Sequence, residues 1–115
     1  DNLNVATAMT VNASAGANAF NVAINGTTNT IAGATTFANT GTLALGNGSD
    51  TINFTGGVTA TAPSAVTLGG TLNTTNNSAS VAIGTSSKTL TLVGTDSAIN
   101  TATSGSGATI TISSA

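Results

Sequence analysis

The sequence predicts an all-β fold, and in particular a parallel β-solenoid of about five to seven short coils. Three observations lead to this prediction. Apolar residues alternate with polar ones, Gly and Asn separate the alternating stretches, and the three aromatic residues recur at a constant interval. Alternation is typical of a strand, whereas an amphipathic helix needs apolar residues three and four positions apart. Residues 1–115 are expected to form a single β-rich structural domain, which is also a candidate segment of a longer protein.

Alternating apolar residues mark the expected strands along the whole chain. The residues between and beside them include many Thr, and Thr, Val and Ile all favour extended backbone. Gly and Asn lie between the stretches, and both tolerate the backbone conformations of tight turns. Short strands are therefore expected about every seven to twelve residues. The alternating apolar positions are Leu3, Val5, Met9, Val11, Phe20, Val22, Ile24, Leu43, Leu45, Ile52, Phe54, Val66, Leu68, Val81, Ile83, Leu90, Leu92, Ile110 and Ile112.

The aromatic residues Phe20, Phe37 and Phe54 are separated by 17 residues each time. A constant interval of about this length is typical of a repeat in which each coil stacks on the one before. The spacing predicts that the three rings form one column in the core, where each pair gains about 0.5–1.5 kcal/mol beyond burial. Inward Asn, Ser and Thr side chains are expected to stack as hydrogen-bonded ladders between the coils.

An immunoglobulin-like β-sandwich is the alternative architecture for a chain of this length. Its support comes from the N-terminal stretch, where Leu3, Val5, Met9 and Val11 mark a longer alternation than a solenoid strand needs. In that architecture the stretch is a candidate donor strand, which inserts into the open sheet of a neighbouring copy.

The sequence lacks most of the side chains that take part in catalysis. The chain has no His, Cys, Trp or Tyr, one Lys or Arg and three Asp or Glu. General acid and base catalysis needs a group that titrates near the working pH, and His is the usual one. Asp50 and Asp96 are the remaining candidates for a glycosidase pair, but the Trp and Tyr on which sugars stack are missing. We therefore expect that the chain is not an enzyme, and we predict no catalytic or cofactor-binding residue in it.

The charge and hydropathy patterns exclude two further classes of partner. A net charge of −2 with a single Lys leaves no basic patch that neutralises phosphates, so nucleic acid is not an expected partner. Polar residues interrupt every apolar stretch well before the roughly 20 residues that a membrane-spanning helix needs, so no membrane span is expected. The chain begins at Asp1, which we interpret as a mature or excised start from which an export signal has been removed.

Two stretches resemble known bacterial surface proteins. The segments TGTLALGNGSDTINFTGG (Thr40 to Gly57) and AVTLGGTLNT (Ala65 to Thr74) resemble the passenger regions of autotransporters and of filamentous-haemagglutinin-type adhesins. The resemblance covers residues 19–95 and is one of style, and similar Thr-rich, weakly charged sequence occurs in S-layer proteins. It implies a β-solenoid on the cell surface that serves in adhesion or surface coating.

The segment from Gly46 to Asn53 is similar to one copy of the calcium-binding nonapeptide of repeats-in-toxin proteins, with Leu45 in place of the first Gly. The resemblance implies that Asp50 gives a carboxylate oxygen to Ca²⁺. One copy does not fill the coordination shell of about six to eight oxygen atoms that Ca²⁺ takes. The simpler interpretation of Asp50 is a solvated turn with an Asx hydrogen bond, so no cofactor is expected and calcium is kept only as a weak candidate.

The expected function is that of an extracellular structural subunit of a bacterial cell surface. Neither end of the sequence carries a charged, Pro-rich or helical cap, so the chain is either part of a longer protein or meets copies of itself end to end in a fibre, filament or S-layer. The alternative is an adhesin module that binds a host surface or a glycan. A minor alternative is ice binding, for which four Thr-x-Thr fragments supply outward Thr, although their spacing along the chain is irregular. The fragments are Thr28-Asn-Thr30, Thr59-Ala-Thr61, Thr89-Leu-Thr91 and Thr101-Ala-Thr103.

Overall fold

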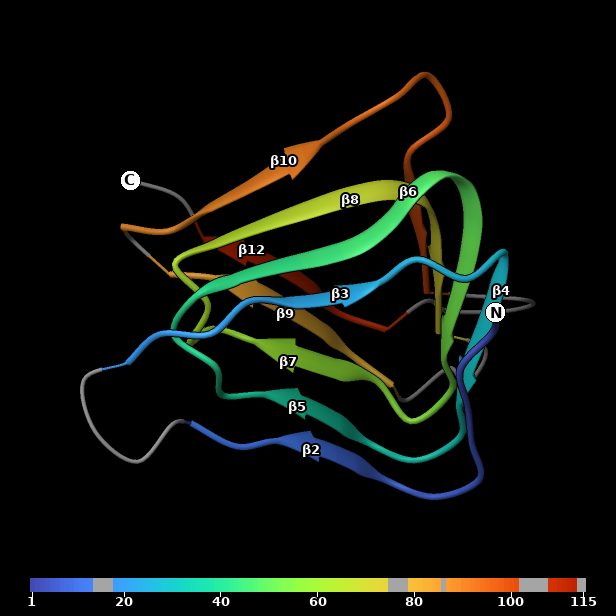
Figure 1. Ribbon diagram of the computed structural model, residues 1–115. Coiled ribbons are helices and arrows are strands. Elements are labelled where there is room, and N and C mark those ends of the chain that lie inside the picture. Colours follow the sequence, from blue (N-terminus) through green and yellow to red (C-terminus); the bar gives the residue numbers. More distant parts are fainter. Residues whose placement is uncertain (14–17, 75–78, 86, 102–107, 114–115) are drawn as a thin grey trace.

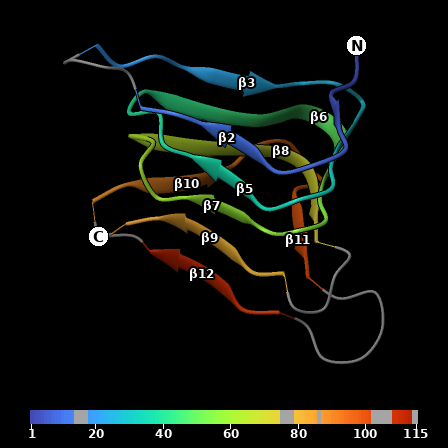
Figure 2. The same cartoon turned by 90° about the horizontal axis from the view of Figure 1, so that it is seen from below.

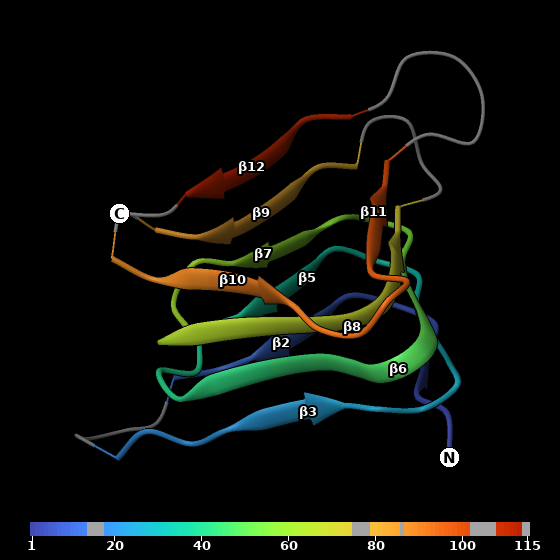
Figure 3. The same ribbon diagram turned by 90° about the horizontal axis from the view of Figure 1, so that it is seen from above.

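The computed structural model describes residues 1–13, 18–74, 79–85, 87–101 and 108–113. In these residues the chain forms an all-β parallel β-solenoid of about four turns, with no helix. Figure 3 shows the coils stacked on one another, with the strands nearest the N-terminus at one end and those nearest the C-terminus at the other. The predicted fold class is confirmed, and the immunoglobulin-like alternative is not the fold that forms. No helix in the described part of the chain has the length and hydrophobicity needed to span a bilayer.

Twelve strands occur among the described residues, and most of them are short. They form because alternating apolar and β-branched residues place one side of each segment in the core and the other in solvent. The strands are β1 (Asn4–Val5), β2 (Met9–Val11), β3 (Val22–Ile24), β4 (Thr28–Ile31), β5 (Thr35–Phe37), β6 (Thr42–Phe54), β7 (Val58–Ala60), β8 (Ala65–Asn73), β9 (Val81–Gly84), β10 (Thr89–Leu92), β11 (Ala98–Asn100) and β12 (Ile110–Ser113).

The strands line the three sides of a prism (Figure 1). The first face contains β3, the N-terminal parts of β6 and β8, and β10. The second face contains β1, β4, the C-terminal parts of β6 and β8, and β11. The third face contains β2, β5, β7, β9 and β12. β6 and β8 are long because each continues through the corner between the first and second faces, and a register shift in β6 between Leu45 and Asp50 marks this corner.

All named strands pair in parallel with the corresponding strand one coil away. On the first face Val22 pairs with Leu43, Leu43 with Val66, and Val66 with Leu90, so successive coils take 21, 23 and 24 residues. These coils are longer than the 17 residues that the phenylalanine spacing predicted. The same chain length therefore makes about four turns, and the prediction of five to seven was too high.

The core is a narrow column of aliphatic and phenylalanine side chains enclosed by the three faces. Its residues come from alternate positions of the strands, as the sequence pattern predicted, and most of them are fully buried. Burial of each Val, Leu, Ile or Phe side chain contributes roughly 1.5–3 kcal/mol relative to exposure. The buried core residues are Ile24, Ile31, Phe37, Leu43, Leu45, Ile52, Phe54, Val58, Ala60, Val66, Leu68, Leu72, Val81 and Ile83.

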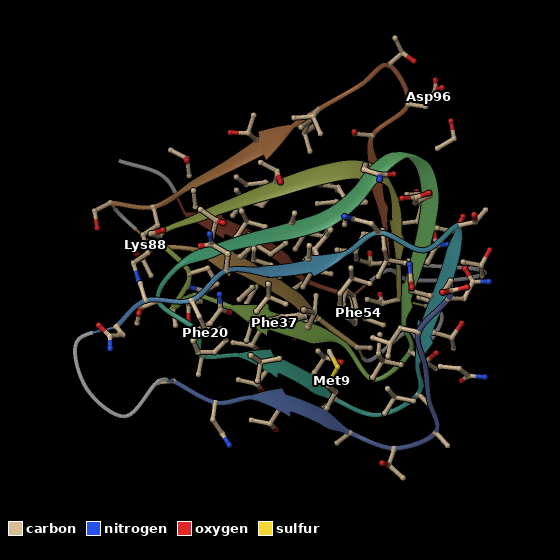
Figure 4. All side chains as sticks on the ribbon, in the orientation of Figure 1. Met9, Phe20, Phe37, Phe54, Lys88 and Asp96 are labelled. Carbon is tan, nitrogen blue, oxygen red and sulfur yellow. The ribbon has the colours of Figure 1, made fainter. Side chains whose placement is uncertain are left out.

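The three phenylalanines do not form one column, which corrects the prediction for Phe20, Phe37 and Phe54. Phe37 and Phe54 are buried and meet edge to face, with ring centroids 6.1 Å apart and planes at 82°. They reach each other from different faces, because Phe37 ends β5 on the third face and Phe54 ends β6 on the second (Figure 4). Phe20 precedes β3 and is 38% exposed. The equal spacing is therefore not the length of a coil.

The N-terminal stretch is not a free donor strand. Leu3 and Val5 lie in or beside β1 on the second face, and Met9 and Val11 lie in β2 on the third. β1 pairs with β4 and β2 with β5, and all four side chains are partly buried against the core. The chain turns a corner at residues 6–8, so the long alternation in the sequence is two short strands of an end coil (Figure 2).

Glycine is required where tight corners of successive coils touch. Between the second and third faces, the corners at residues 6–8, 32–34 and 55–57 lie directly on one another. A Cβ atom on Gly33 would lie 2.4 Å from the Ala8 backbone nitrogen, and one on Gly56 would lie 2.4 Å from the Gly33 carbonyl carbon. Side chains at these two positions would therefore separate the coils or distort the corner.

We predict that Gly33→Ala and Gly56→Ala each lower the free energy of unfolding by roughly 1–3 kcal/mol, because the added methyl group meets backbone that cannot move aside cheaply. Gly48→Ala is the matched control, since a Cβ atom there meets nothing within 4 Å. It is expected to leave stability unchanged or raise it by up to about 1 kcal/mol through the unfolded state. Urea unfolding followed by circular dichroism measures all three, and equal losses at the three positions would contradict the packing argument.

Candidate functional site

The charged side chains lie at the corners and at the N-terminus, and not in the middle of any strand face. Asp50 occurs at the corner between the first and second faces, where the register of β6 shifts. Asp96 occurs at the same corner of a later coil, and Lys88 at the corner between the third and first faces (Figure 4). Asp1 precedes β1. The outward positions of the strands carry mainly Thr, Ala, Asn and Ser, so all three faces are uncharged surfaces of small polar residues.

Asp50 shapes its corner by accepting a backbone hydrogen bond. Its side chain is 9% exposed, and its Oδ2 atom accepts a hydrogen bond from the Asn47 backbone nitrogen at 3.0 Å. A side-chain hydrogen bond at this turn agrees with the simpler alternative to calcium binding, but the Asp50 side chain is buried and not solvated as that alternative expected. The Asp96 side chain is exposed two coils further along and interacts with the Thr95 hydroxyl at 3.3 Å. Among the described residues, no three His, Cys, Asp or Glu side chains gather closely enough to hold a metal ion.

Lys88 bonds to the main chain of the preceding coil. Its Nζ atom donates to the carbonyl oxygens of Thr61 at 3.3 Å and Ala62 at 2.5 Å. A pocket of about 280 Å³ lies at the opposite end of the solenoid, between the N-terminal segment and the end of β3. Asp1 is the only ionisable side chain in its lining, which otherwise consists of Asn, Gly and aliphatic residues.

A ladder of hydrogen-bonded side chains crosses the second face. The Asn100 Nδ2 atom donates to Asn73 Oδ1 at 3.1 Å, and Asn73 Nδ2 donates to Asn53 Oδ1 at 3.1 Å. Asn53 Nδ2 then donates to the Thr30 hydroxyl at 3.3 Å. The backbone register places Asn4 next to Thr30 in the same column. The ladder spans four successive coils, and its amides all donate in the direction of the N-terminal end.

The ladder lies on the outside of the solenoid, whereas the sequence predicted inward ladders. The inward Asn29 and Asn39 bond to the backbone: Asn29 Oδ1 accepts from the Leu3 nitrogen at 2.9 Å, and Asn39 Nδ2 donates to the Phe20 and Thr42 carbonyls. One signal in the sequence marks the outer ladder. The triplets Thr51-Ile52-Asn53, Thr71-Leu72-Asn73 and Ala98-Ile99-Asn100 each place Asn directly after a buried or partly buried aliphatic residue. Their unequal spacing hid the repeat.

The Thr-x-Thr fragments do not gather on one face. Thr28 and Thr30 lie in β4 on the second face, Thr59 lies in β7 on the third, and Thr89 and Thr91 lie in β10 on the first. The fourth fragment begins at Thr101, which is buried, and Thr103 lies outside the described residues. These fragments therefore do not build the single flat Thr array on which the ice-binding alternative depends.

The two ends of the solenoid combine unpaired strand edges with exposed apolar side chains. β1, β2 and β3 each pair on one side only, and so do β10, β11 and β12 at the other end. All five large hydrophobic side chains that are exposed among the described residues lie in or next to these end strands. They are Phe20, Leu92, Val93, Ile110 and Ile112, with exposed fractions from 38% to 56%.

These features define the class of protein: a three-sided parallel β-solenoid with uncharged strand faces and open coil ends. A scan against protein-family models, a search of curated proteins and a search of solved structures each found no match to this chain. The function is therefore inferred from the fold and from the geometry of the candidate sites.

We predict that Asn73→Ala lowers the free energy of unfolding by about 1–3 kcal/mol, because it removes two ladder hydrogen bonds of about 0.5–1.5 kcal/mol each. Asn47→Ala is the control, since Asn47 is exposed at a corner and the same atoms are deleted there. Its effect is expected to stay within about 0.5 kcal/mol. Thermal unfolding of the two variants provides the comparison, and a loss at Asn47 as large as that at Asn73 would refute a stabilising ladder.

At the Asp50 corner, Asp50→Ala is expected to cost about 1–3 kcal/mol, because it deletes the acceptor for the Asn47 nitrogen, whereas Asp50→Asn retains a side-chain oxygen and costs less. Millimolar Ca²⁺ is expected to leave the melting temperature of the unaltered protein unchanged, since one carboxylate does not fill the shell of the ion. A rise in melting temperature that Asp50→Asn abolishes would instead support the calcium site that the nonapeptide resemblance implied.

Proposed function

We propose that this chain is an extracellular structural module of a bacterial surface, and that it associates with copies of itself through its coil ends into a fibre, filament or layer. The observation that carries this proposal is the position of the exposed apolar residues. All five large ones in the described part of the chain lie at the two coil ends, where sheet edges are also unpaired. Such an edge is a template for pairing with another chain.

The middle of the solenoid supports the same role in a different way. Its charged side chains are confined to the corners, where Asp50 lies at the bend of β6, and its core and Asn ladder repeat from coil to coil. Stacked repeats of this kind derive stability from contacts between neighbours, so further coils add stability without a new kind of contact. The extracellular location is supported by the resemblance of residues 19–95 to bacterial surface passengers and adhesins.

The proposal assigns no catalytic reaction and no cofactor to the chain. The ionisable side chains are few, and the described carboxylates of Asp50 and Asp96 lie two coils apart at a corner. Copies of the chain are the proposed partners, and nucleic acid is not among them because a single Lys gives no cationic surface.

An adhesin module that binds a host surface or a glycan is the second candidate function. The outer ladder favours it, because each Asn amide uses one N–H group in the ladder and keeps a second for a ligand. A monomer that binds cells or an immobilised glycan array would support this function.

Self-association is tested by sedimentation velocity over a range of protein concentrations, with negative-stain electron microscopy of the same samples. We expect oligomers that grow with concentration, and filaments or sheets in the images. Ile112→Lys places a charge on the exposed side of the last coil and is expected to weaken association about tenfold or more, which corresponds to about 1.4 kcal/mol.

Thr59→Lys is the matched control on the same face. Thr59 is exposed in β7, away from both coil ends, so its substitution is expected to leave end-to-end association unchanged. Circular dichroism checks that both variants fold. A chain that stays monomeric at every concentration would contradict the proposed self-association, and a larger effect of Thr59→Lys would move the contact from the ends to the faces.

A further inference from the structure

On the second and third faces, the first and last strands place equivalent residues in the same column of side chains along the solenoid axis. On the second face, one outward column runs through Asn4, Thr30, Asn53, Asn73 and Asn100, from β1 to β11. The outward residue of this column is therefore Asn at both of its ends, in β1 and in β11.

The third face has a similar arrangement, in which the residues that the first and last strands contribute are apolar. One inward column begins at Met9 in β2, passes through Thr35, Val58 and Val81, and ends at Ile110 in β12. The neighbouring inward position is Val11 in β2 and Ile112 in β12. Ile110 and Ile112 are 42% and 49% exposed at the C-terminal end, and Met9 and Val11 are partly buried at the N-terminal end.

The ladder gives the direction in which two copies fit. Every amide in it donates to the coil on its N-terminal side, so the ladder acceptor at the last rung that receives no hydrogen bond from a described residue is Asn100 Oδ1. A chain that adds beyond β11 must bring a donor to this position. The Asn4 amide of a second copy is such a donor, and it belongs to the same column by register.

We propose that a second copy adds its first coil to the last coil of this one, with β1 of the second copy on β11 and its β2 on β12. Asn4 of the second copy then lies on Asn100 and extends the ladder, while Met9 and Val11 of the second copy cover Ile110 and Ile112. This register rests on the proposed self-association and specifies its interface. The contact is head to tail and does not close on itself, so repetition gives a filament.

Two dimensions of the filament follow from this register. The second face contributes five strands per copy, namely β1, β4, β6, β8 and β11, so the rise per copy is about 24 Å at a strand spacing of about 4.8 Å. The first face contributes only β3, β6, β8 and β10. No strand of the described residues therefore fills one position on that face at each joint, between Leu92 of one copy and Phe20 of the next.

Cysteine cross-linking tests the register directly, because the chain has no Cys of its own. In Asn4→Cys/Asn100→Cys, the two thiols of adjacent copies lie on neighbouring strands about 4.8 Å apart, which is within the range of a disulfide. Within one copy the same residues are four strand positions apart, or about 19 Å, and do not reach each other. Oxidation is expected to convert the monomer into a series of disulfide-linked multimers on non-reducing gels.

A second pair on the third face leaves the ladder intact. Thr10→Cys/Thr111→Cys is expected to form the same series, since Thr10 and Thr111 are outward residues of β2 and β12 in one column. Asn4→Cys/Thr111→Cys is the matched control, because its two positions lie on different faces; it is expected to stay monomeric on the gel. The single variants Asn4→Cys and Asn100→Cys are also expected to stay monomeric, and a disulfide dimer of either would show a head-to-head or tail-to-tail contact instead.

The outcomes separate the register from the proposed function. Filaments of the unaltered protein without cross-links in either pair, or with an axial rise different from about 24 Å, would overturn the register and leave self-association standing. Absence of both oligomers and cross-links would overturn self-association itself. Cross-linked multimers in both pairs, with an unreactive control, establish the head-to-tail register.

Discussion

Parallel main-chain pairing between successive coils is the constraint on which the rest of this structure depends. Each coil places its strands about 4.8 Å from those of the coil before, and the register then puts every side chain beside its counterpart. Side chains consequently form columns, and a residue is compatible with the fold only if it tolerates its neighbours in the column. At the tight corners, successive coils lie so close together that there is no room for a Cβ atom, which explains Gly33 and Gly56.

The scarcity of charge follows from these columns. Two like charges about 4.8 Å apart repel by roughly 1 kcal/mol even in water, and a column would repeat the repulsion at every coil. Residues that satisfy an identical neighbour avoid this cost. Asn both donates and accepts, and aliphatic side chains pack on one another, so Asn73 meets Asn53 and Leu72 meets Ile52 without conflict. The charged residues are confined to the corners and the N-terminal segment.

Self-complementary columns also connect the fold to the proposed function. A column that accepts its own residue types within the chain accepts them equally from a second copy. Ile110 and Ile112 in the last coil have the same inward orientation as Val81 and Ile83 in the coil before. Val81 and Ile83 are buried because the last coil covers them, whereas Ile110 and Ile112 are exposed. Association through coil ends is thus the continuation between molecules of the contact that stabilises each one.

The sequence by itself determined that the chain is built of short strands, because alternation and turn residues are local properties: Ile52 and Phe54 face the core as predicted. Coil length, the contact of Phe37 with Phe54 and the outer Asn ladder were decided by tertiary structure. The reason is that the segments between strands differ in length, with three residues between β4 and β5 and nine between β11 and β12. Residues in one column are therefore not equally spaced along the chain, and only the pairing of distant strands brings Asn53, Asn73 and Asn100 together.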